Sequence, residues 1–315
     1  MKLIDMHCDS MGEVFLHPEQ NILNKGGHLD LEMIEKVGGT VQFFALFMYR
    51  DCIEKYGAYD LFHRMYDTYV KQMELNREHV LPVLKAEDIE KNEKAGKISS
   101  LLTVEDGVFL DGHIERVDEA YEKGVRLITL LWNFENSLGY PSSDDPEEHM
   151  RGLKPFGIEA VERMNDLGII VDLSHSSEGV FYDVAKYSKK PFIASHSCAR
   201  ALCGHRRNLT DGQLKTLGEK GGVAGINFYG CFLEDDCDYP TVDLIMKHMR
   251  YMTDKAGIES VGFGSDFDGI ESAGELENYL GFKKIIAAME KEYTDDEIDK
   301  ICYSNAMRVI KEVIG

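Results

Sequence analysis

The sequence predicts an α/β fold, a (β/α)₈ TIM barrel with additional helices at its C-terminal end. Three observations support this prediction. The chain has 315 residues, of which 43% are hydrophobic, and this length suits one large barrel. Short apolar runs rich in β-branched residues alternate with longer amphipathic segments, as parallel strands alternate with helices. No repeat, low-complexity tract or Pro/Gly/Ser-rich linker divides the chain, so we expect one domain over residues 1–315.

Eight apolar runs account for the strands of this barrel. Each run is short, and a helical pattern separates it from the next one, as in βαβ units. A doubly wound open sheet is the alternative, but the Gly-rich phosphate loop of its nucleotide-binding forms is missing after the first run. In chain order, the strands are expected at residues 2–7, 40–48, 99–105, 125–132, 169–174, 191–196, 222–228 and 260–266.

Helices are expected between these strands, where apolar residues recur with helical spacing among charged ones. Asp30 and Thr210 are suitable N-terminal caps, and Gly168 and Gly218 mark helix ends. Two further helical patterns follow the eighth strand and form the C-terminal addition. In chain order, the helices are expected at residues 30–37, 59–76, 114–123, 157–167, 179–187, 210–218, 243–256, 275–291 and 295–314.

Charge and cysteine content limit the partners and the location. The chain carries 35 Lys and Arg against 56 Asp and Glu, a formal net charge of −21, which disfavours nucleic acids and anionic membranes. Its 7 cysteines include no C-x-x-C pair and fit a reducing compartment. The N-terminus lacks the apolar segment of a secretory signal, and the longest apolar run, residues 43–49, is too short to cross a membrane. We therefore expect a cytoplasmic protein.

Side chains of the types that bind metals recur where the predicted strands end. In a barrel the active site lies at the carboxyl ends of the strands. His7 and Asp9 share one face of the chain because strand side chains alternate with period two. A lone histidine at a strand end is more often structural, whereas a set of five points to a metal centre. The five are His7, Asp9, Glu105, His175 and His196.

Imidazole and carboxylate ligands without a thiolate suit zinc, with manganese, cobalt or iron as alternatives. Five ligands exceed the needs of one four-coordinate ion, so we expect two metal ions per chain, bridged by Glu105. Two metals would activate a water molecule for attack on a carbonyl or phosphoryl centre. Asp266 is the candidate proton carrier for the leaving group. Asp268 shares its parity and is the alternative, although an aspartate before Gly269 also suits a loop cap.

Other polar residues have weaker signals. Arg206 and Arg207 follow the sixth strand, and one of them could bind a substrate carboxylate through its planar guanidinium, or pair with the acidic surface. His149 and His248 are expected at the surface, on a loop or a helix face. Cys198 and Cys203 lie near His196 but are expected to pack in the interior rather than to act as nucleophiles.

Six short motifs occur in an order that resembles the renal (membrane) dipeptidase family of the metal-dependent amidohydrolase superfamily. The resemblance spans residues 5–269, and the ordered set is much more specific than any one motif. The motifs are Asp-Met-His-Cys-Asp at 5–9, Val-Glu-Asp-Gly at 104–107, Asp-Leu-Ser-His at 172–175, Ala-Ser-His-Ser at 194–197, Arg-Arg-Asn-Leu at 206–209 and Gly-Ser-Asp-Phe-Asp-Gly at 264–269.

This resemblance implies a barrel with a binuclear zinc site that hydrolyses dipeptides, often with a D-residue at the C-terminal position. It implies that His7 and Asp9 hold one zinc ion, that His175 and His196 hold the other, and that Glu105 bridges them. By the same resemblance, Asp266 is the catalytic acid/base, Arg207 binds the substrate carboxylate, and Tyr229 belongs to the substrate pocket.

The sequence departs from the family at the end of the fourth strand. Better-known vertebrate members carry a histidine there that contacts the substrate carbonyl, whereas this chain has Trp132. An indole N–H donates one hydrogen bond but carries no charge, so oxyanion stabilisation would depend more on the metal or on Asn133. The vertebrate members are also secreted and lipid-anchored, and this sequence has neither signal.

The sequence therefore predicts a zinc-dependent dipeptidase that uses a metal-bridging hydroxide. An alternative keeps the barrel and the metals but acts on another amide, a lactone, a β-lactam or a phosphoester. A catalytically silent metal-binding barrel is a third hypothesis, against which the complete ligand set and Asp266 count. A homodimer is compatible with a barrel of this size, but no feature of the sequence decides it.

Overall fold

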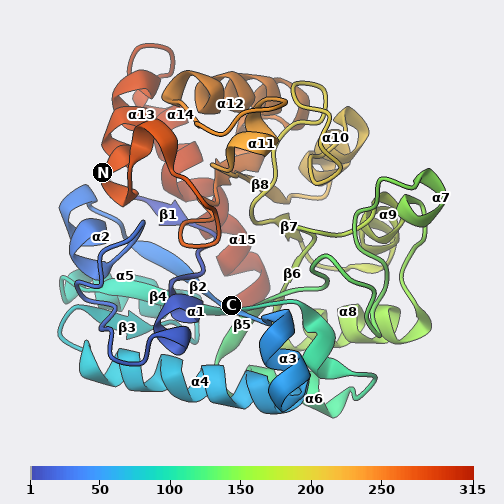
Figure 1. Cartoon of the computed structure of the whole chain (residues 1–315). Coiled ribbons are helices and arrows are strands. Elements are labelled where there is room, and N and C mark those ends of the chain that lie inside the picture. The colour runs from blue at the N-terminus through green and yellow to red at the C-terminus, as the bar shows by residue number, and fades with distance from the viewer. Residues whose placement is uncertain (1) are drawn as a thin grey trace.

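Eight parallel strands close into a barrel in the computed structural model, which describes residues 2–315 (Figure 1). β1 pairs with β2 on one side and with β9 on the other, and β2 pairs with β4 along its whole length, which closes the ring. All eight predicted strands are present; seven are shorter than predicted, and β4 begins one residue earlier. They are β1 (Ile4–Asp5), β2 (Val41–Phe47), β4 (Ile98–Glu105), β5 (Val125–Thr129), β6 (Ile170–Asp172), β7 (Ile193–Ala194), β8 (Val223–Ile226) and β9 (Val261–Phe263).

A ninth strand, β3 (Val80–Pro82), was not predicted from the sequence. It pairs with the start of β4, where Val80 lies opposite Ile98, and β5 takes over the same edge of β4 from Leu102 onward. β3 therefore lies beside the barrel wall and adds no member to the closed ring. A three-residue strand that ends in proline is too short to show a periodic pattern.

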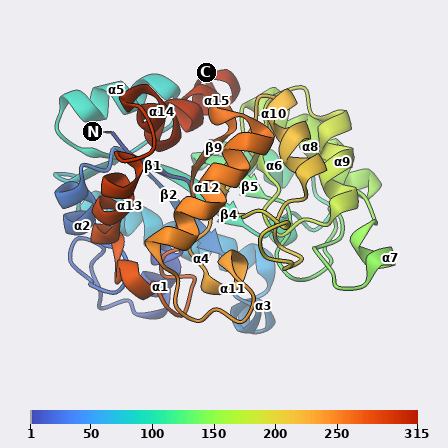
Figure 2. The same cartoon turned by 90° about the horizontal axis from the view of Figure 1, so that it is seen from above.

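Helices surround the barrel on its outside and connect consecutive strands along the chain (Figure 2). The seven helices predicted between strands are present within a few residues of the predicted bounds. The helices are α1 (Ser10–Leu16), α2 (Leu31–Val37), α3 (Arg50–Tyr56), α4 (Ala58–Leu75), α5 (Ala86–Lys94), α6 (Glu115–Glu122), α7 (Pro146–His149), α8 (Pro155–Leu167), α9 (Glu178–Tyr187), α10 (Asp211–Glu219), α11 (Gly230–Leu233), α12 (Val242–Ala256), α13 (Phe282–Met289), α14 (Asp295–Asp299) and α15 (Asn305–Ile314).

The helix predicted over residues 275–291 is wrong in its first half. Glu277 has a φ of 65°, and Asn278 is extended, so neither residue continues an α-helix. Two short 3₁₀ turns, Gly274–Leu276 and Tyr279–Gly281, precede α13 instead. The second C-terminal prediction covers α14, a π-helical turn at Lys300–Ser304 and α15 in succession.

α15 closes the amino-terminal end of the barrel. Its apolar face packs in one buried cluster with side chains from the strands, including Met307 and Ile310 from the helix and Phe43 and Leu101 from β2 and β4. A separate, larger cluster lies between the strands and the surrounding helices. With the amino-terminal end filled by apolar side chains, polar chemistry is confined to the carboxyl ends of the strands.

Two histidines predicted at the surface are buried. His149 is 8% exposed and His248 is 0% exposed. The Nδ1 atom of His248 accepts from the Ala199 N–H at 3.1 Å, and its Nε2 lies 2.8 Å from the carbonyl oxygen of Leu233. His248 thus ties α12 to the loop after β7 and to α11, a tertiary contact that the amphipathic pattern of one helix does not reveal.

Candidate active site

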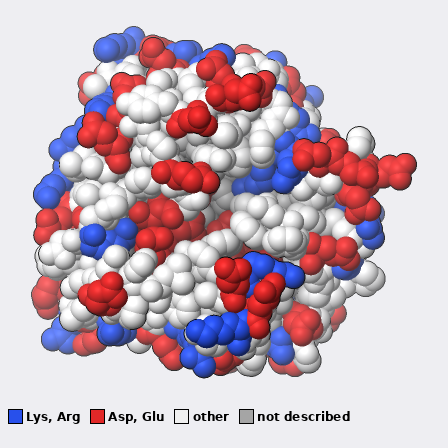
Figure 3. All heavy atoms as spheres, in the orientation of Figure 1, with Lys and Arg blue, Asp and Glu red and all other residues white. Residues whose placement is uncertain are grey.

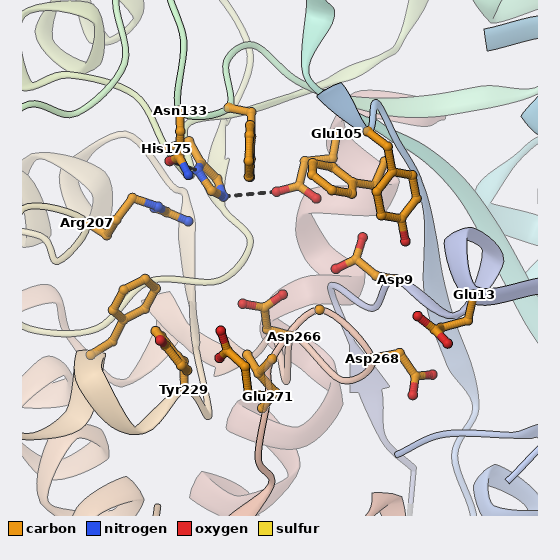
Figure 4. A pocket seen from close by; sticks show the side chains of 16 residues that line it. Asp9, Glu13, Glu105, Asn133, His175, Arg207, Tyr229, Asp266, Asp268 and Glu271 are labelled. Carbon is orange, nitrogen blue, oxygen red and sulfur yellow. Dashed lines mark hydrogen bonds and ion pairs between the residues drawn. The ribbon is translucent and has the colours of Figure 1, made fainter. Parts of the chain in front are cut away.

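A cavity of about 290 Å³ opens at the carboxyl ends of the strands (Figure 4). Its lining comes from the loops after almost every strand and combines carboxylates, aromatic rings and one arginine. The lining residues are Asp9, Glu13, Phe47, Tyr49, Glu105, Trp132, Asn133, His175, Arg207, Tyr229, Phe232, Asp266, Asp268, Gly269, Ile270 and Glu271.

The structure brings the five predicted metal ligands together at the base of this cavity, and all five are buried. Glu105, the last residue of β4, lies between them. Its Oε2 is 3.4 Å from His7 Nε2. Its Oε1 is 2.9 Å from His175 Nε2 and 3.6 Å from His196 Nε2. The two carboxylate oxygens thus face two different groups of ligands, as a bridging carboxylate must.

A second group of ligand atoms lies around His7. Its Nε2 is 3.4 Å from Asp9 Oδ2 and 3.7 Å from Asp266 Oδ1. Within residues 2–315, His7 Nε2 and Asp9 Oδ1 are buried and have no hydrogen-bond partner. Two sets could each hold a cation: His7 with Glu105 and His196, and His7 with Asp9 and Asp266.

Hydrogen bonds fix which nitrogen of each histidine faces the site. The hydroxyl of Ser195 donates to Asp172 Oδ2 at 2.6 Å, so it can only accept from His196 Nδ1, which lies at 2.8 Å. Asn133 Oδ1 in turn accepts from His175 Nδ1 at 3.1 Å.

Both histidines therefore direct an unprotonated Nε2 inward, and these two nitrogens are only 3.1 Å apart. Two facing lone pairs and a shared carboxylate are the donor set of a divalent cation, so the residues present fit the predicted metal centre.

Asp172 is the anchor of this arrangement. Its carboxylate is buried and accepts hydrogen bonds from the Thr129 hydroxyl, from the Ser174 and Ser195 backbone N–H groups and from the Ser195 hydroxyl. The sequence prediction gave no role to Asp172 or Ser195, although both lie in the motifs around the two histidines. Their role depends on contact between neighbouring strands.

Burial and crowded carboxylates shift the pKa values of the site. Burial raises the pKa of Glu105 to about 8, and the nearby charge of Asp9 adds to this. Burial also raises the pKa of Asp266 to about 6, although the charge of His7 opposes the shift. For His7 itself, burial favours the neutral ring, but Glu105 and Asp9 outweigh it and hold its pKa well above the ordinary value. Burial and the charge of Arg207 hold the pKa of His175 well below its ordinary value.

Asp266 lies in a tight turn after β9 that aims its carboxylate at the ligand cluster. Its Oδ2 accepts from Asn227 Nδ2 at 2.8 Å. A Cβ atom at Gly269 would lie 2.1 Å from Asp9 Oδ2 and 2.7 Å from Asp266 Oδ1. Glycine at this position therefore allows the two carboxylates to approach each other from opposite ends of the sequence.

Asp268, the alternative proton carrier, is engaged elsewhere. Its Oδ2 pairs with Lys25 Nζ at 2.8 Å, and the two side chains are only 5% and 3% exposed. It also accepts from the Ser10 hydroxyl, and its Oδ1 accepts from the His28 backbone N–H at 3.0 Å. These contacts fit the loop-capping role considered for Asp268 and leave Asp266 as the better candidate for proton transfer.

The two candidate arginines have different surroundings. Arg206 forms an ion pair with Asp144 at 2.6 Å. This contact corresponds to the second expectation for the two arginines, pairing with the acidic surface. Arg207 lines the cavity, is 5% exposed, and has no hydrogen-bond partner for Nε or Nη2 within the described residues. Burial lowers the pKa of Arg207 to about 10, which keeps it charged at neutral pH. A buried, unpaired guanidinium in a cavity is a ready site for an anion.

The remaining predicted residues, Trp132, Asn133 and Tyr229, also line the cavity. Trp132 packs edge-on against Phe47 with ring centroids 5.0 Å apart, and its ring lies 6.2 Å from that of His175. The sequence prediction missed Glu13, Tyr49 and Glu271. Glu13 follows Asp9 by one turn of α1, so its position would have been apparent had that short helix been predicted.

Comparisons with known proteins add to this geometry. Residues 1–314 match the family model for membrane dipeptidase, peptidase family M19. The chain is 34% identical to an uncharacterized protein in the pqqA 5′ region of Klebsiella pneumoniae, over 73% of this chain and 88% of that protein. It is 30% identical to the dipeptidase tcpJ of Claviceps purpurea, over 99% of this chain and 75% of that protein.

A solved metallopeptidase from Rhodobacter sphaeroides, liganded with a phosphinate mimic of the dipeptide L-Ala-D-Ala, has the same fold. Its TM-score is 0.90 at 24% identity, with 99% of both chains covered.

Proposed function

The chain belongs to the membrane dipeptidase family, peptidase family M19, and is a metallopeptidase of that class; on this premise we propose that it hydrolyses dipeptides with two divalent metal ions, zinc first among them. The observation that carries the proposal is the ligand cluster around Glu105, set beside the unpaired guanidinium of Arg207 in one cavity. His7 and Asp9 would hold one ion, His175 and His196 the other, and Glu105 both. When bound, such a pair lowers the pKa of a shared water molecule and polarises a carbonyl group.

The side chains of this protein then supply substrate binding, proton transfer and stabilisation of the developing charge. Arg207 binds the C-terminal carboxylate of the substrate and so positions the scissile bond above Glu105. Asp266 takes the proton of the attacking water and passes it to the departing amine, a role that its elevated pKa of about 6 suits. Trp132 and Asn133, which line the cavity, would donate N–H groups to the carbonyl oxygen as it develops charge, and Tyr229 would close the pocket.

Arg207 also explains the preference for dipeptides. A longer peptide would place a neutral peptide group against a buried cation, which leaves the cation without a counter-charge. The Rhodobacter sphaeroides structure carries a mimic of a dipeptide with a D-residue at its C-terminal position. We propose that this chain accepts such substrates as well.

A panel of L-L and L-D dipeptides tests the proposal. The zinc-loaded protein should hydrolyse members of the panel, and His175→Ala should abolish turnover and reduce the bound zinc measured by elemental analysis. His113→Ala, whose side chain is exposed and does not line the cavity, is the matched control and should keep both. Absence of turnover by zinc-replete wild-type protein on every dipeptide would contradict the proposal.

Trp132, in place of the family's histidine, favours a second candidate. In this case the same site hydrolyses another amide, a lactone, a β-lactam or a phosphoester. Turnover of uncharged amides that is insensitive to Arg207→Ala would support it. A catalytically silent barrel would bind zinc and show no turnover on either panel.

The cellular setting remains a prediction. None of the helices in residues 2–315 is both long and apolar enough to cross a membrane. The cytoplasmic location still depends on the scattered cysteines of the sequence, and the homodimer has no support beyond the size of the barrel.

A further inference from the structure

Glu13 lies at the end of the cavity opposite Arg207. In Figure 4, Arg207 is at one side of the pocket, the carboxylates of Glu105, Asp9 and Asp266 are in the middle, and Glu13 is at the far side. Glu13 is half-buried on α1, one turn after Asp9. Its carboxylate has no hydrogen bond and no ion pair with any other described residue.

The other carboxylates near this end of the cavity already interact with neighbouring groups. Asp9 and Asp266 belong to the ligand cluster, and Asp268 is neutralised by Lys25 at 2.8 Å. The Tyr49 hydroxyl cannot supply a positive charge. Burial, together with the charges of Asp9 and Glu13, raises its pKa, so it stays neutral. Glu13 is therefore a carboxylate in the cavity wall that forms no ion pair with any residue in 2–315.

The length of a dipeptide determines which of its groups can contact Glu13. The buried, unpartnered guanidinium of Arg207 marks the carboxylate end of the ligand, and the unpartnered, buried Asp9 Oδ1 marks its middle. With the carboxylate on Arg207 and the scissile bond at Glu105, the amino-terminal residue extends toward Glu13. The α-ammonium group is common to all dipeptides and lies next to the scissile bond. The side chain of the amino-terminal residue extends further from that bond, toward Glu13.

We propose that Glu13 makes the enzyme selective for dipeptides whose amino-terminal residue has a basic side chain, such as lysine or arginine. This inference depends on the proposed function, because it assigns a substrate class to the same site. Phe47 and Tyr49, whose ring centroids are 4.6 Å apart, line the same cavity as Glu13 and offer aromatic surface to the methylene stem of such a side chain. A charge-assisted contact in a half-buried setting favours the basic substrate roughly tenfold in kcat/KM.

Matched substrates test this selectivity. We expect the zinc-loaded wild-type protein to hydrolyse Lys-Ala with a kcat/KM roughly tenfold above that for norleucine-Ala, which has a stem of similar length without the charge. Added salt should reduce this ratio, since it screens the ion pair. Glu13→Gln should bring the ratio close to one, and Glu13→Lys should invert the preference between Lys-Ala and Glu-Ala.

Glu19→Gln is the matched control, because Glu19 is exposed beyond the end of α1 and does not line the cavity; it should keep the wild-type ratio. A wild-type ratio near one overturns the inference, as does a ratio that persists in Glu13→Gln or that follows Glu271→Gln instead. These results leave dipeptide hydrolysis itself intact. Absence of turnover on every dipeptide would instead remove the proposed function and this inference together. Should Glu13→Gln fail to fold, the inference is still tested by the wild-type ratio of kcat/KM for Lys-Ala over norleucine-Ala and by the salt dependence of that ratio.

Discussion

Single residues set the chemistry of this site through their hydrogen bonds as much as through their identity. His196 can present an unprotonated Nε2 to a cation because the Ser195 hydroxyl, which donates to Asp172, accepts a hydrogen bond from the His196 Nδ1–H. The same logic applies to His175 and Asn133. Replacing either support would leave the ligand present but free to present the wrong tautomer.

Arg207→Ala should lower kcat/KM for dipeptides about a hundredfold, since the loss of a buried charged contact costs roughly 3 kcal/mol. Arg207→Lys should recover part of this loss, because an ammonium group restores the charge without the planar fork. Steady-state kinetics on a free dipeptide and on its C-terminal amide provides the measurement. The amide should be a poor substrate for the wild-type protein and should lose little more in the variant. An unchanged kcat/KM for the free dipeptide would remove Arg207 from the carboxylate site.

Asp266→Asn should lower kcat by two to four orders of magnitude while KM and bound zinc change little. The amide keeps the size of the carboxylate and loses its ability to take up a proton. Kinetics and metal analysis on the same preparation separate the two effects. Asp268→Asn is the comparison. Because Asp268 pairs with Lys25, we expect a loss of stability rather than a selective loss of kcat. A normal kcat for Asp266→Asn would contradict this role of Asp266 and make Asp268 the candidate proton carrier.

The sequence predicts this site well wherever the residue type and the strand end are enough. His7, Asp9, Glu105, His175, His196 and Asp266 follow from those two facts, and the structure places them in one cluster. Their roles stay predictions until tested. Glu13 and the support from Ser195 were missed because they depend on an unpredicted helix and on contacts between strands, which a period-two pattern does not contain.

At the scale of elements, the sequence predicts the barrel because short, buried and mostly apolar strands alternate with longer amphipathic helices. The pattern fails where an element is short or held by tertiary contacts. β3 has three residues, and α7 and α11 have four each, so none shows a period. In the segment before α13, the positive φ of Glu277 interrupts a sequence that otherwise reads as helical.

His248, on α12, gives the stability of the fold a measurable pH dependence. Burial lowers its pKa in the folded protein to about 4, from an ordinary value of 6.5. Between these values the unfolded chain binds a proton that the folded protein does not. Stability from this group is therefore complete above pH 6.5 and is lost as the pH falls toward 4. The full loss is roughly 3 kcal/mol.

His248→Gln should reduce this dependence, because an amide can keep a contact to Leu233 without titrating. The measurement is the free energy of unfolding in urea at pH 7 and pH 4.5, for the wild type and the variant. His113→Gln, at an exposed position, is the control and should keep the wild-type slope. An identical fall in stability for the wild type and His248→Gln would show that His248 is protonated without cost.

At the scale of the whole molecule, the candidate metal centre joins distant parts of the chain. Its ligands come from the ends of β1, β4, β6 and β7, and Asp266 adds the end of β9 (Figure 1). Acidic side chains also dominate the hollow on this face, bordered by basic ones on one side (Figure 3). Without cations, the carboxylates of Asp9, Glu105 and Asp266 repel one another in a buried space, which destabilises the closed barrel.

Metal removal should therefore lower stability as well as activity. A cation that binds only the folded barrel stabilises it by about 4 kcal/mol at a thousandfold excess over Kd. Dialysis against a chelator should lower Tm by several degrees, and zinc should restore both Tm and turnover. His175→Ala should respond to zinc with a smaller shift, since one set of ligands is incomplete. Equal Tm values in chelator and in zinc would mean that the carboxylates tolerate one another without a cation, which would contradict the metal centre while leaving the barrel intact.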